Sequence, residues 1–133
     1  MKRYIAPALT LATGIAIGAV AAQNLHAQAK LPVYYISEID VTNPEAYAKE
    51  YSPKAQALIK AGGGKIVAVG GAAQPNTQVV AFDGDPPKRV TVQVWDSMDQ
   101  IKAWRANPDY QAARKIGEQY AMFRSFALQA VAQ

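Results

Sequence analysis

The chain has 133 residues and a formal net charge of +4, with one histidine and no cysteine. Its length suits one domain with a single core, and the lack of cysteine excludes disulfides and thiol nucleophiles. No basic run or stripe is present to neutralise a phosphate backbone, so nucleic-acid binding finds no support.

The N-terminus has the three parts of a cleavable export signal. Lys2 and Arg3 form a positive segment, residues 5–22 are uncharged, and residues 23–28 are more polar. The small-x-small pattern that ends at Ala29 is typical of a cleavage site. We therefore expect a signal peptide over residues 1–29.

Cleavage would leave residues 30–133 as a single exported domain, periplasmic or secreted. It would remove His26, the only histidine, which excludes haem held by a proximal histidine, histidine-ligated zinc and histidine triads. Losing the two basic residues of the signal lowers the net charge from +4 to +2. An uncleaved membrane anchor is the alternative, because the uncharged segment approaches the ~20 residues that span a bilayer.

The first half of the expected domain predicts a strand and a helix. Residues 33–39 are β-branched and aromatic, which predicts the first strand. Asn-Pro-Glu at 43–45 combines a capping side chain, a proline and an acid, and predicts a helix that runs to Ala61. Because Pro53 removes a backbone hydrogen bond, we expect a kink or two short helices near residues 51–52. The predicted buried stripe consists of Tyr47, Tyr51, Ala55, Leu58 and Gly62.

The middle of the chain predicts further strands. Residues 65–69 lie between glycine groups and predict a second strand. A long structureless loop is unusual in a small domain, so residues 78–82 are predicted to form a short edge strand. Residues 83–87 then form a turn, and residues 89–95 alternate in polarity like a strand whose two faces differ.

The last third predicts a helix in two parts and a final strand. Ser97 and Gln100 form a capping box, and Asn-Pro-Asp at 107–109 restarts the helix. Residues 123–131 alternate like a strand. The element order predicts an α+β, ferredoxin-like split βαβ fold, with helices on one face of an antiparallel sheet. Apolar residues on both faces of several strands favour a homodimer, in which a second copy covers the other face.

Six segments carry a recognisable pattern, and they lie at 41–47, 63–71, 87–97, 103–104, 107–111 and 123–126. In their order and spacing they resemble the domain of unknown function 1330 family, small bacterial proteins of the dimeric α/β-barrel superfamily. The resemblance implies a ferredoxin-like protomer whose sheet packs against that of a twin. It implies no activity. The wider superfamily includes cofactor-independent oxygenases, lactone isomerases and haem enzymes, which makes a pocket between helices and sheet an expectation by analogy.

Two charged residues are candidates for a functional site. Glu38 is the candidate catalytic carboxylate, because it lies within an apolar strand where partial burial would raise its pKa; the alternative is that it points into water. Arg124 is a candidate ligand-binding residue, because its planar guanidinium can bind a carboxylate or enolate. It can equally form a structural pair with Asp96, Asp99 or Glu118.

Three aromatic residues, Trp95, Trp104 and Tyr110, are candidates to line a ligand pocket, although aromatic residues at such spacings also build cores and dimer interfaces. We therefore expect an exported homodimer that binds a small anionic or aromatic molecule, with no cofactor, no metal and no membrane contact after cleavage. The alternatives are a cofactor-independent oxygenase or isomerase that uses Glu38 or a tyrosine as base, and a structural or interaction protein of the cell envelope.

Overall fold

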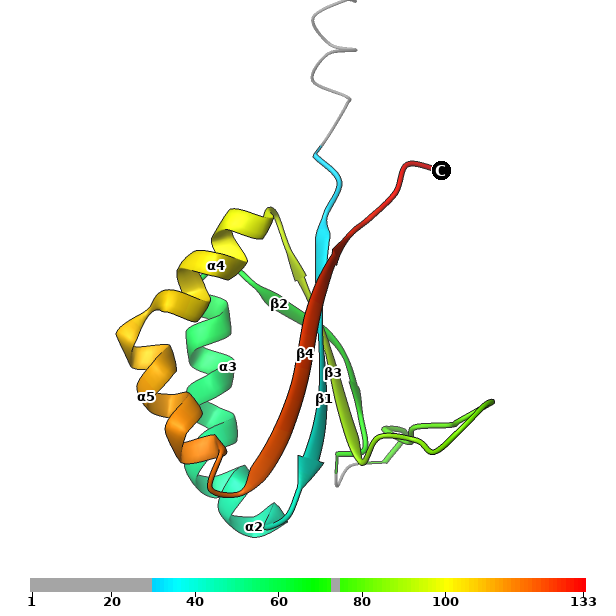
Figure 1. The fold of residues 1–133 in the computed structure, drawn as a ribbon, viewed down its shortest axis with the longest axis vertical. Helices are drawn as coiled ribbons and strands as arrows, with labels where there is room; N and C mark the ends of the chain where they lie inside the picture. Colours follow the sequence, from blue (N-terminus) through cyan, green and yellow to red (C-terminus); the bar gives the residue numbers. More distant parts are fainter. Residues whose placement is uncertain (1–29, 73–74) are drawn as a thin grey trace, which may run out of the picture. The chain divides into compact units, whose positions relative to one another are not determined.

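The computed structural model describes residues 30–72 and 75–133, so the expected signal peptide at 1–29 lies outside the described residues. From Leu31 onward the chain forms one compact unit. A four-stranded sheet has its helices on one side (Figure 1). In chain order the elements are β1 (Val33–Val41), α2 (Pro44–Ala46), the π-helical turn η1 (Tyr47–Tyr51), α3 (Ser52–Ala61), β2 (Lys65–Gly70), β3 (Arg89–Trp95), α4 (Met98–Ala106), α5 (Pro108–Gly117) and β4 (Ala121–Gln129).

The sheet has the strand order β2-β3-β1-β4, and all its neighbouring strands are antiparallel. This arrangement confirms the predicted α+β fold of ferredoxin-like type. On β1 the residues Val33, Tyr35, Ser37 and Ile39 are buried under the helices. Because side chains alternate along a strand, the intervening residues point to the opposite side.

We call that opposite side of the sheet the outer face. On the three strands β1, β3 and β4 it carries Tyr34, Ile36, Glu38, Asp40, Val90, Val92, Val94, Met122, Arg124, Phe126 and Leu128. Three of its large apolar side chains are exposed, namely Met122, Phe126 and Leu128. The helix-facing side of the sheet is therefore covered within the protomer, and the outer face is not.

The interruption predicted near residues 51–52 lies where the π-helical turn η1 ends at Tyr51 and α3 begins at Ser52. The N–H of Ser52 donates to the carbonyl oxygen of Tyr47, which closes a wider turn than the α-helix has. As a result Tyr47, Tyr51, Ala55 and Ile59, at intervals of four residues, are all buried. The predicted stripe had Leu58 in place of Ile59, because a regular helical period was assumed through the turn.

The predicted edge strand at residues 78–82 is wrong. These residues form no strand, and the connection between β2 and β3 leaves the sheet on the side away from the helices (Figure 1). Gly71 has a φ of +72°, and its N–H donates to the carbonyl oxygen of Thr77. The positive φ explains why glycine is favoured at this position.

The core under the helices is aromatic at one end of the sheet. The ring centroids of Trp95 and Trp104 lie 5.0 Å apart, and those of Trp104 and Tyr110 lie 4.3 Å apart. A Cβ on Gly64 would lie 2.5 Å from the Trp95 ring, so this position has no room for a side chain. Within residues 30–72 and 75–133, none of the helices has the length and apolar character that crossing a bilayer requires.

Candidate functional site

A cavity of about 60 Å³ lies between the helices and the sheet. We call it the tyrosine–arginine cavity, because four tyrosines and two arginines are among its polar lining residues, which are Tyr35, Tyr47, Tyr51, Tyr110, Arg89, Arg114, Ser37, Ser52, Gln56, Thr91 and Gln93. No carboxylate is among its lining residues. A water molecule needs about 10–15 Å³ of such space, so the cavity holds several waters or a small ligand.

Arg89 enters the cavity from the start of β3. It is paired in register with Ile39, which places its side chain on the helix-facing side of the sheet. Its guanidinium carbon lies 5.5 Å from the centroid of the Tyr47 ring, and its Nε is buried without a hydrogen-bond partner. In the part of the chain that the structure describes, Arg89 forms no ion pair. Its charge is therefore offset by no carboxylate of the fold.

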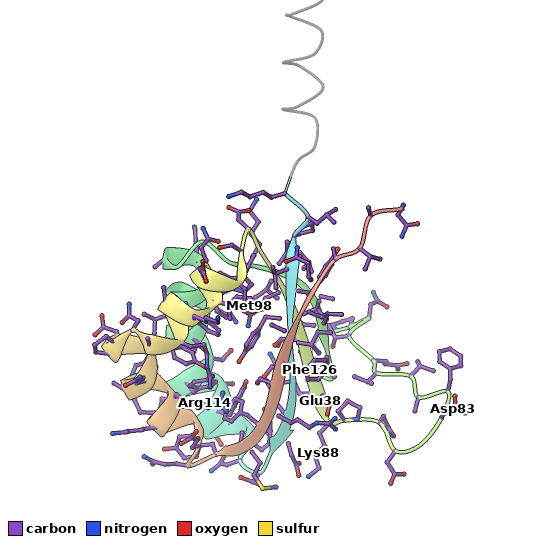
Figure 2. The ribbon with its side chains drawn as sticks, turned by 45° about the horizontal axis from the view of Figure 1, so that its top comes forward. Glu38, Asp83, Lys88, Met98, Arg114 and Phe126 are labelled. Atoms are coloured by element: carbon purple, nitrogen blue, oxygen red, sulfur yellow. The ribbon has the colours of Figure 1, made fainter. Side chains whose placement is uncertain are left out.

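Arg114 enters the cavity from α5, between the helices and the sheet (Figure 2). Its guanidinium carbon lies 3.6 Å from the centroid of the Phe123 ring, a close cation–π contact. Its Nε donates to Glu118 at 3.0 Å, and its Nη1 donates to the Tyr110 hydroxyl at 3.4 Å. These contacts fix the plane of the guanidinium group at the cavity wall.

The phenols of Tyr47, Tyr51 and Tyr110 are neutral at neutral pH. Burial raises the pKa values of Tyr47, Tyr51 and Tyr110, and the nearby arginines only partly offset this rise. For Arg114, burial alone would lower the pKa, but Tyr110 and the hydrogen bond to Glu118 outweigh it and the pKa is raised. The cavity therefore combines cationic guanidinium groups with neutral hydroxyls.

The polar atoms that lack partners near the cavity are hydrogen-bond donors. Besides Arg89 Nε, the indole Nε1 of Trp104, another lining residue, is buried without a partner. The polar neighbours deeper in the wall are already paired, since Ser37 Oγ lies 2.7 Å from Ser125 Oγ and the Gln93 side chain accepts from Trp95 Nε1 at 2.9 Å. Unpaired donors favour a ligand that brings acceptor oxygens.

The structure separates the residues that the sequence proposed for a site. Trp104 and Tyr110 line the tyrosine–arginine cavity, whereas Trp95 is fully buried in the adjacent core and does not line it. Glu38 and Arg124 lie on the outer face, where their side chains pair at 3.3 Å. Arg124 thus pairs with Glu38, not with the three carboxylates considered from the sequence, and it lies across the sheet from the cavity.

Sequence reasoning missed both arginines of the cavity. Arg89 lies on the same face of β3 as the buried residues Gln93 and Trp95, because side chains alternate along a strand. Arg114 follows the buried Tyr110 by one helical turn and so lies on the same side of α5. In both places the sequence signal was a basic residue on a face whose other residues are buried. Among the described residues there is no group of three or more histidine, aspartate or glutamate side chains that could hold a metal ion.

The family described as domain of unknown function (DUF1330) has a model that matches residues 32–131 of the chain. The match spans the whole sheet and all the helices of the described domain. No curated protein matches the chain.

Several solved structures share the fold. A protein of unknown function from Rhodopseudomonas palustris is 20% identical, with a TM-score of 0.57 and coverage of 86% of this chain and 94% of that one. SnoaB, a cofactor-independent oxygenase from Streptomyces nogalater, is 16% identical, with a TM-score of 0.55 and coverage of 77% and 96%. A dimeric protein of unknown function and ferredoxin-like fold from Bacteroides fragilis is 17% identical, with a TM-score of 0.54 and coverage of 74% and 96%. Similarity at these identities establishes the fold alone.

Proposed function

The chain belongs to the DUF1330 family, as its sequence pattern predicted, and within this family of unknown function we propose that it binds a small anionic molecule in the tyrosine–arginine cavity. The ligand class is a carboxylate or enolate, either aliphatic or carried on an aromatic ring. The proposal keeps the chemistry expected from the sequence and moves it from Arg124 to Arg89 and Arg114.

The observation that carries this proposal is the imbalance of charge and hydrogen bonding in the cavity. Two guanidinium groups line it, only that of Arg114 is paired with a carboxylate among the described residues, and two buried donors, Arg89 Nε and Trp104 Nε1, have no partner. A buried charge is costly unless it is paired, and an unmade hydrogen bond costs about 1–3 kcal/mol. An oxyanion would satisfy both requirements at once, since guanidinium groups bind carboxylates through paired N–H donors.

Catalysis by the residues considered from the sequence has less support. A phenol whose pKa is raised by burial is a poor general base at neutral pH, and this applies to Tyr47, Tyr51 and Tyr110. Glu38, the other candidate base, points to the outer face and not into the cavity. We therefore favour binding over the oxygenase or isomerase alternative.

We also propose that the protein acts as a homodimer that pairs through the outer face. Met122, Phe126 and Leu128 are 64%, 41% and 45% exposed on this face. Contiguous exposed apolar side chains of this kind mark an interaction surface. One solved structure with the same fold is described as a dimer, which is consistent with this proposal.

Export is the third part of the proposal. It rests on the sequence pattern of residues 1–29, with a basic start, an uncharged segment and a small-x-small end. The ligand would then be met outside the cytoplasm, in the periplasm or the medium. The cavity needs no cysteine, histidine or metal for binding, so it is compatible with either location.

Thermal unfolding of the purified protein in sodium acetate, sodium benzoate or sodium chloride at equal ionic strength tests the binding proposal. A carboxylate at about 100 times its dissociation constant should raise the melting temperature by several degrees, whereas neutral benzamide should not. Arg89→Gln and Arg114→Gln should abolish the rise. Arg124→Gln makes the same substitution on the outer face and should retain it. The proposal would be contradicted if the carboxylates raised the melting temperature of all three variants equally, or if they did not raise that of the wild type.

A further inference from the structure

The connection between β2 and β3 contains an arm, residues 78–87, whose tip exposes large apolar side chains. We propose that this arm is an intersubunit clasp whose tip packs against the second copy in the homodimer. The inference rests on the proposed homodimer and adds to it a segment and a residue, Phe82, that would hold the two copies together.

The arm exposes apolar side chains that its own protomer does not cover. Phe82 is 93% exposed and Val80 is 66% exposed. The neighbouring Val79 instead packs against Gly70, since a Cβ added to Gly70 would lie 2.5 Å from the Val79 side chain. Burying phenylalanine or valine side chains is favourable, so both residues would be stabilised by a partner surface. Loops longer than about 12–15 residues are uncommon in small domains and are usually functional.

The arm lies on the same side of the molecule as the uncovered sheet surface. Figure 2 shows Asp83 at the far end of the arm, well away from the sheet and from the helices. The base of the arm, at Pro86 and Pro87, borders a groove of about 360 Å³ whose other walls include Glu38, Met122 and Arg124 of the outer face. A molecule that covers the outer face therefore also meets the arm.

The dimensions of the arm suit a second copy of this chain. Sheets that pack face to face are about 10 Å apart, and the six residues 78–83 can span at most about 20 Å. The arm is thus long enough to pass the interface and reach the body of the other protomer. In a two-fold dimer each arm clasps the opposite copy, so the contact forms twice.

Charged side chains lie on both the arm and the outer face. Asp83 and Asp85 at the tip of the arm are exposed acids. The outer face and its border expose the cations Arg124 and Lys88, with side chains 79% and 67% exposed, and each is paired with a carboxylate of its own protomer, Glu38 and Asp40. An acidic arm that reaches a second copy would meet these exposed ion pairs, and a second copy supplies the arm and the ion pairs in both directions.

Sedimentation equilibrium of the full protein with Phe82→Ser tests this inference. Because Phe82 is almost fully exposed, the substitution should leave the protomer folded, which thermal unfolding monitored by circular dichroism checks. The dissociation constant of the dimer should rise at least tenfold. Phe82→Leu keeps an apolar side chain and should stay within a few-fold of the wild type. Val131→Ser, at an equally apolar position that is 77% exposed outside the arm, is the matched control.

The outcomes separate the clasp from the dimer itself. A dimeric wild type that weakens with Phe82→Ser and not with Val131→Ser supports the clasp. A dimeric wild type whose dissociation constant is the same with Phe82→Ser overturns the clasp and leaves the homodimer intact. A wild type that is monomeric at all concentrations overturns both.

Discussion

Glu38 on β1 and Arg124 on β4 lie directly opposite each other on the outer face, with carboxylate and guanidinium 3.3 Å apart. The sequence suggested Glu38 for catalysis and Arg124 for ligand binding. In the structure they form an ion pair with each other, on the opposite side of the sheet from the cavity. The cations that line the cavity are instead Arg89, whose Nε is buried without a hydrogen-bond partner, and Arg114, which is paired with Glu118. We therefore propose the outer face for assembly and the helix-facing side for binding.

Charge reversal on the outer face should dissociate the proposed dimer. Arg124→Glu places two carboxylates opposite each other on neighbouring strands, and like charges in that position are destabilising. We expect the dissociation constant to rise at least tenfold by analytical ultracentrifugation. The exchange variant Glu38→Arg/Arg124→Glu restores the pair and should recover most of the affinity. If single and double variants dissociate alike, the pair has no part in assembly.

The buried phenols predict a loss of stability at alkaline pH. The pKa values of Tyr47, Tyr51 and Tyr110 are raised above the ordinary value of 10.0, so above pH 10 the unfolded chain loses phenolic protons that the folded chain keeps. The free energy of unfolding is insensitive to these groups below pH 10. Above pH 10, the free energy of unfolding falls by up to about 1.4 kcal/mol per pH unit for each proton that the folded chain retains.

Tyr51→Phe removes one of these protons. Urea unfolding between about pH 9 and pH 11 should therefore show a shallower fall in the free energy of unfolding than in the wild type. The comparison of slopes is the measurement, because the variant also loses the polar contacts of the hydroxyl at every pH. Identical slopes would show that Tyr51 ionises alike in the folded and unfolded chains.

The close approach of α5 to η1 depends on Gly117. An added Cβ would lie 2.7 Å from Cδ2 of the Tyr51 ring, so Gly117→Ala should destabilise the fold by about 1–3 kcal/mol, although alanine favours helices. In a Tyr51→Ala background the clash is absent, and the same substitution should cost nothing. Urea unfolding of the four proteins of this double-mutant cycle measures the coupling. A coupling energy near zero would contradict the packing described here.

The expected signal peptide is tested by the N-terminus of the mature protein. When the full chain is expressed with an export pathway available, we expect Lys30 to be the first residue of the mature protein. N-terminal sequencing or intact-mass measurement of the periplasmic or secreted fraction provides the check. An intact chain in the membrane fraction would support the anchor alternative instead.

The fold could be predicted from local signals in the sequence. The Asn43 and Asn107 side chains cap α2 and α5 by accepting from the N–H groups of Ala46 and Asp109, at 3.1 and 2.8 Å. Alternation predicted β3 with its observed bounds, Arg89–Trp95. The strand predicted at residues 78–82 was wrong, because the apolar residues of this part of the arm have the composition of a strand but pair with no strand of the sheet.

The cavity could be predicted only in part. Trp104 and Tyr110 belong to a helix stripe whose burial follows from helical spacing, so their position near a cavity was within reach. Arg89 and Arg124 both lie near a strand end, and only the register decides which of them faces the helices. Because a shift of one residue exchanges the two faces of a strand, sequence alone could not choose between them.

The most direct test of anion binding uses the two tryptophans of the chain as reporters. In a ¹H–¹⁵N correlation spectrum each indole gives one signal, and Trp104→Phe identifies the signal of Trp104. Trp95 Nε1 already donates to Gln93, whereas Trp104 Nε1 has no partner. Titration with sodium benzoate or sodium acetate should shift the Trp104 signal saturably, leave that of Trp95 almost unchanged, and have no effect in Arg89→Gln. A Trp104 signal that stays fixed with both anions would contradict binding in the tyrosine–arginine cavity.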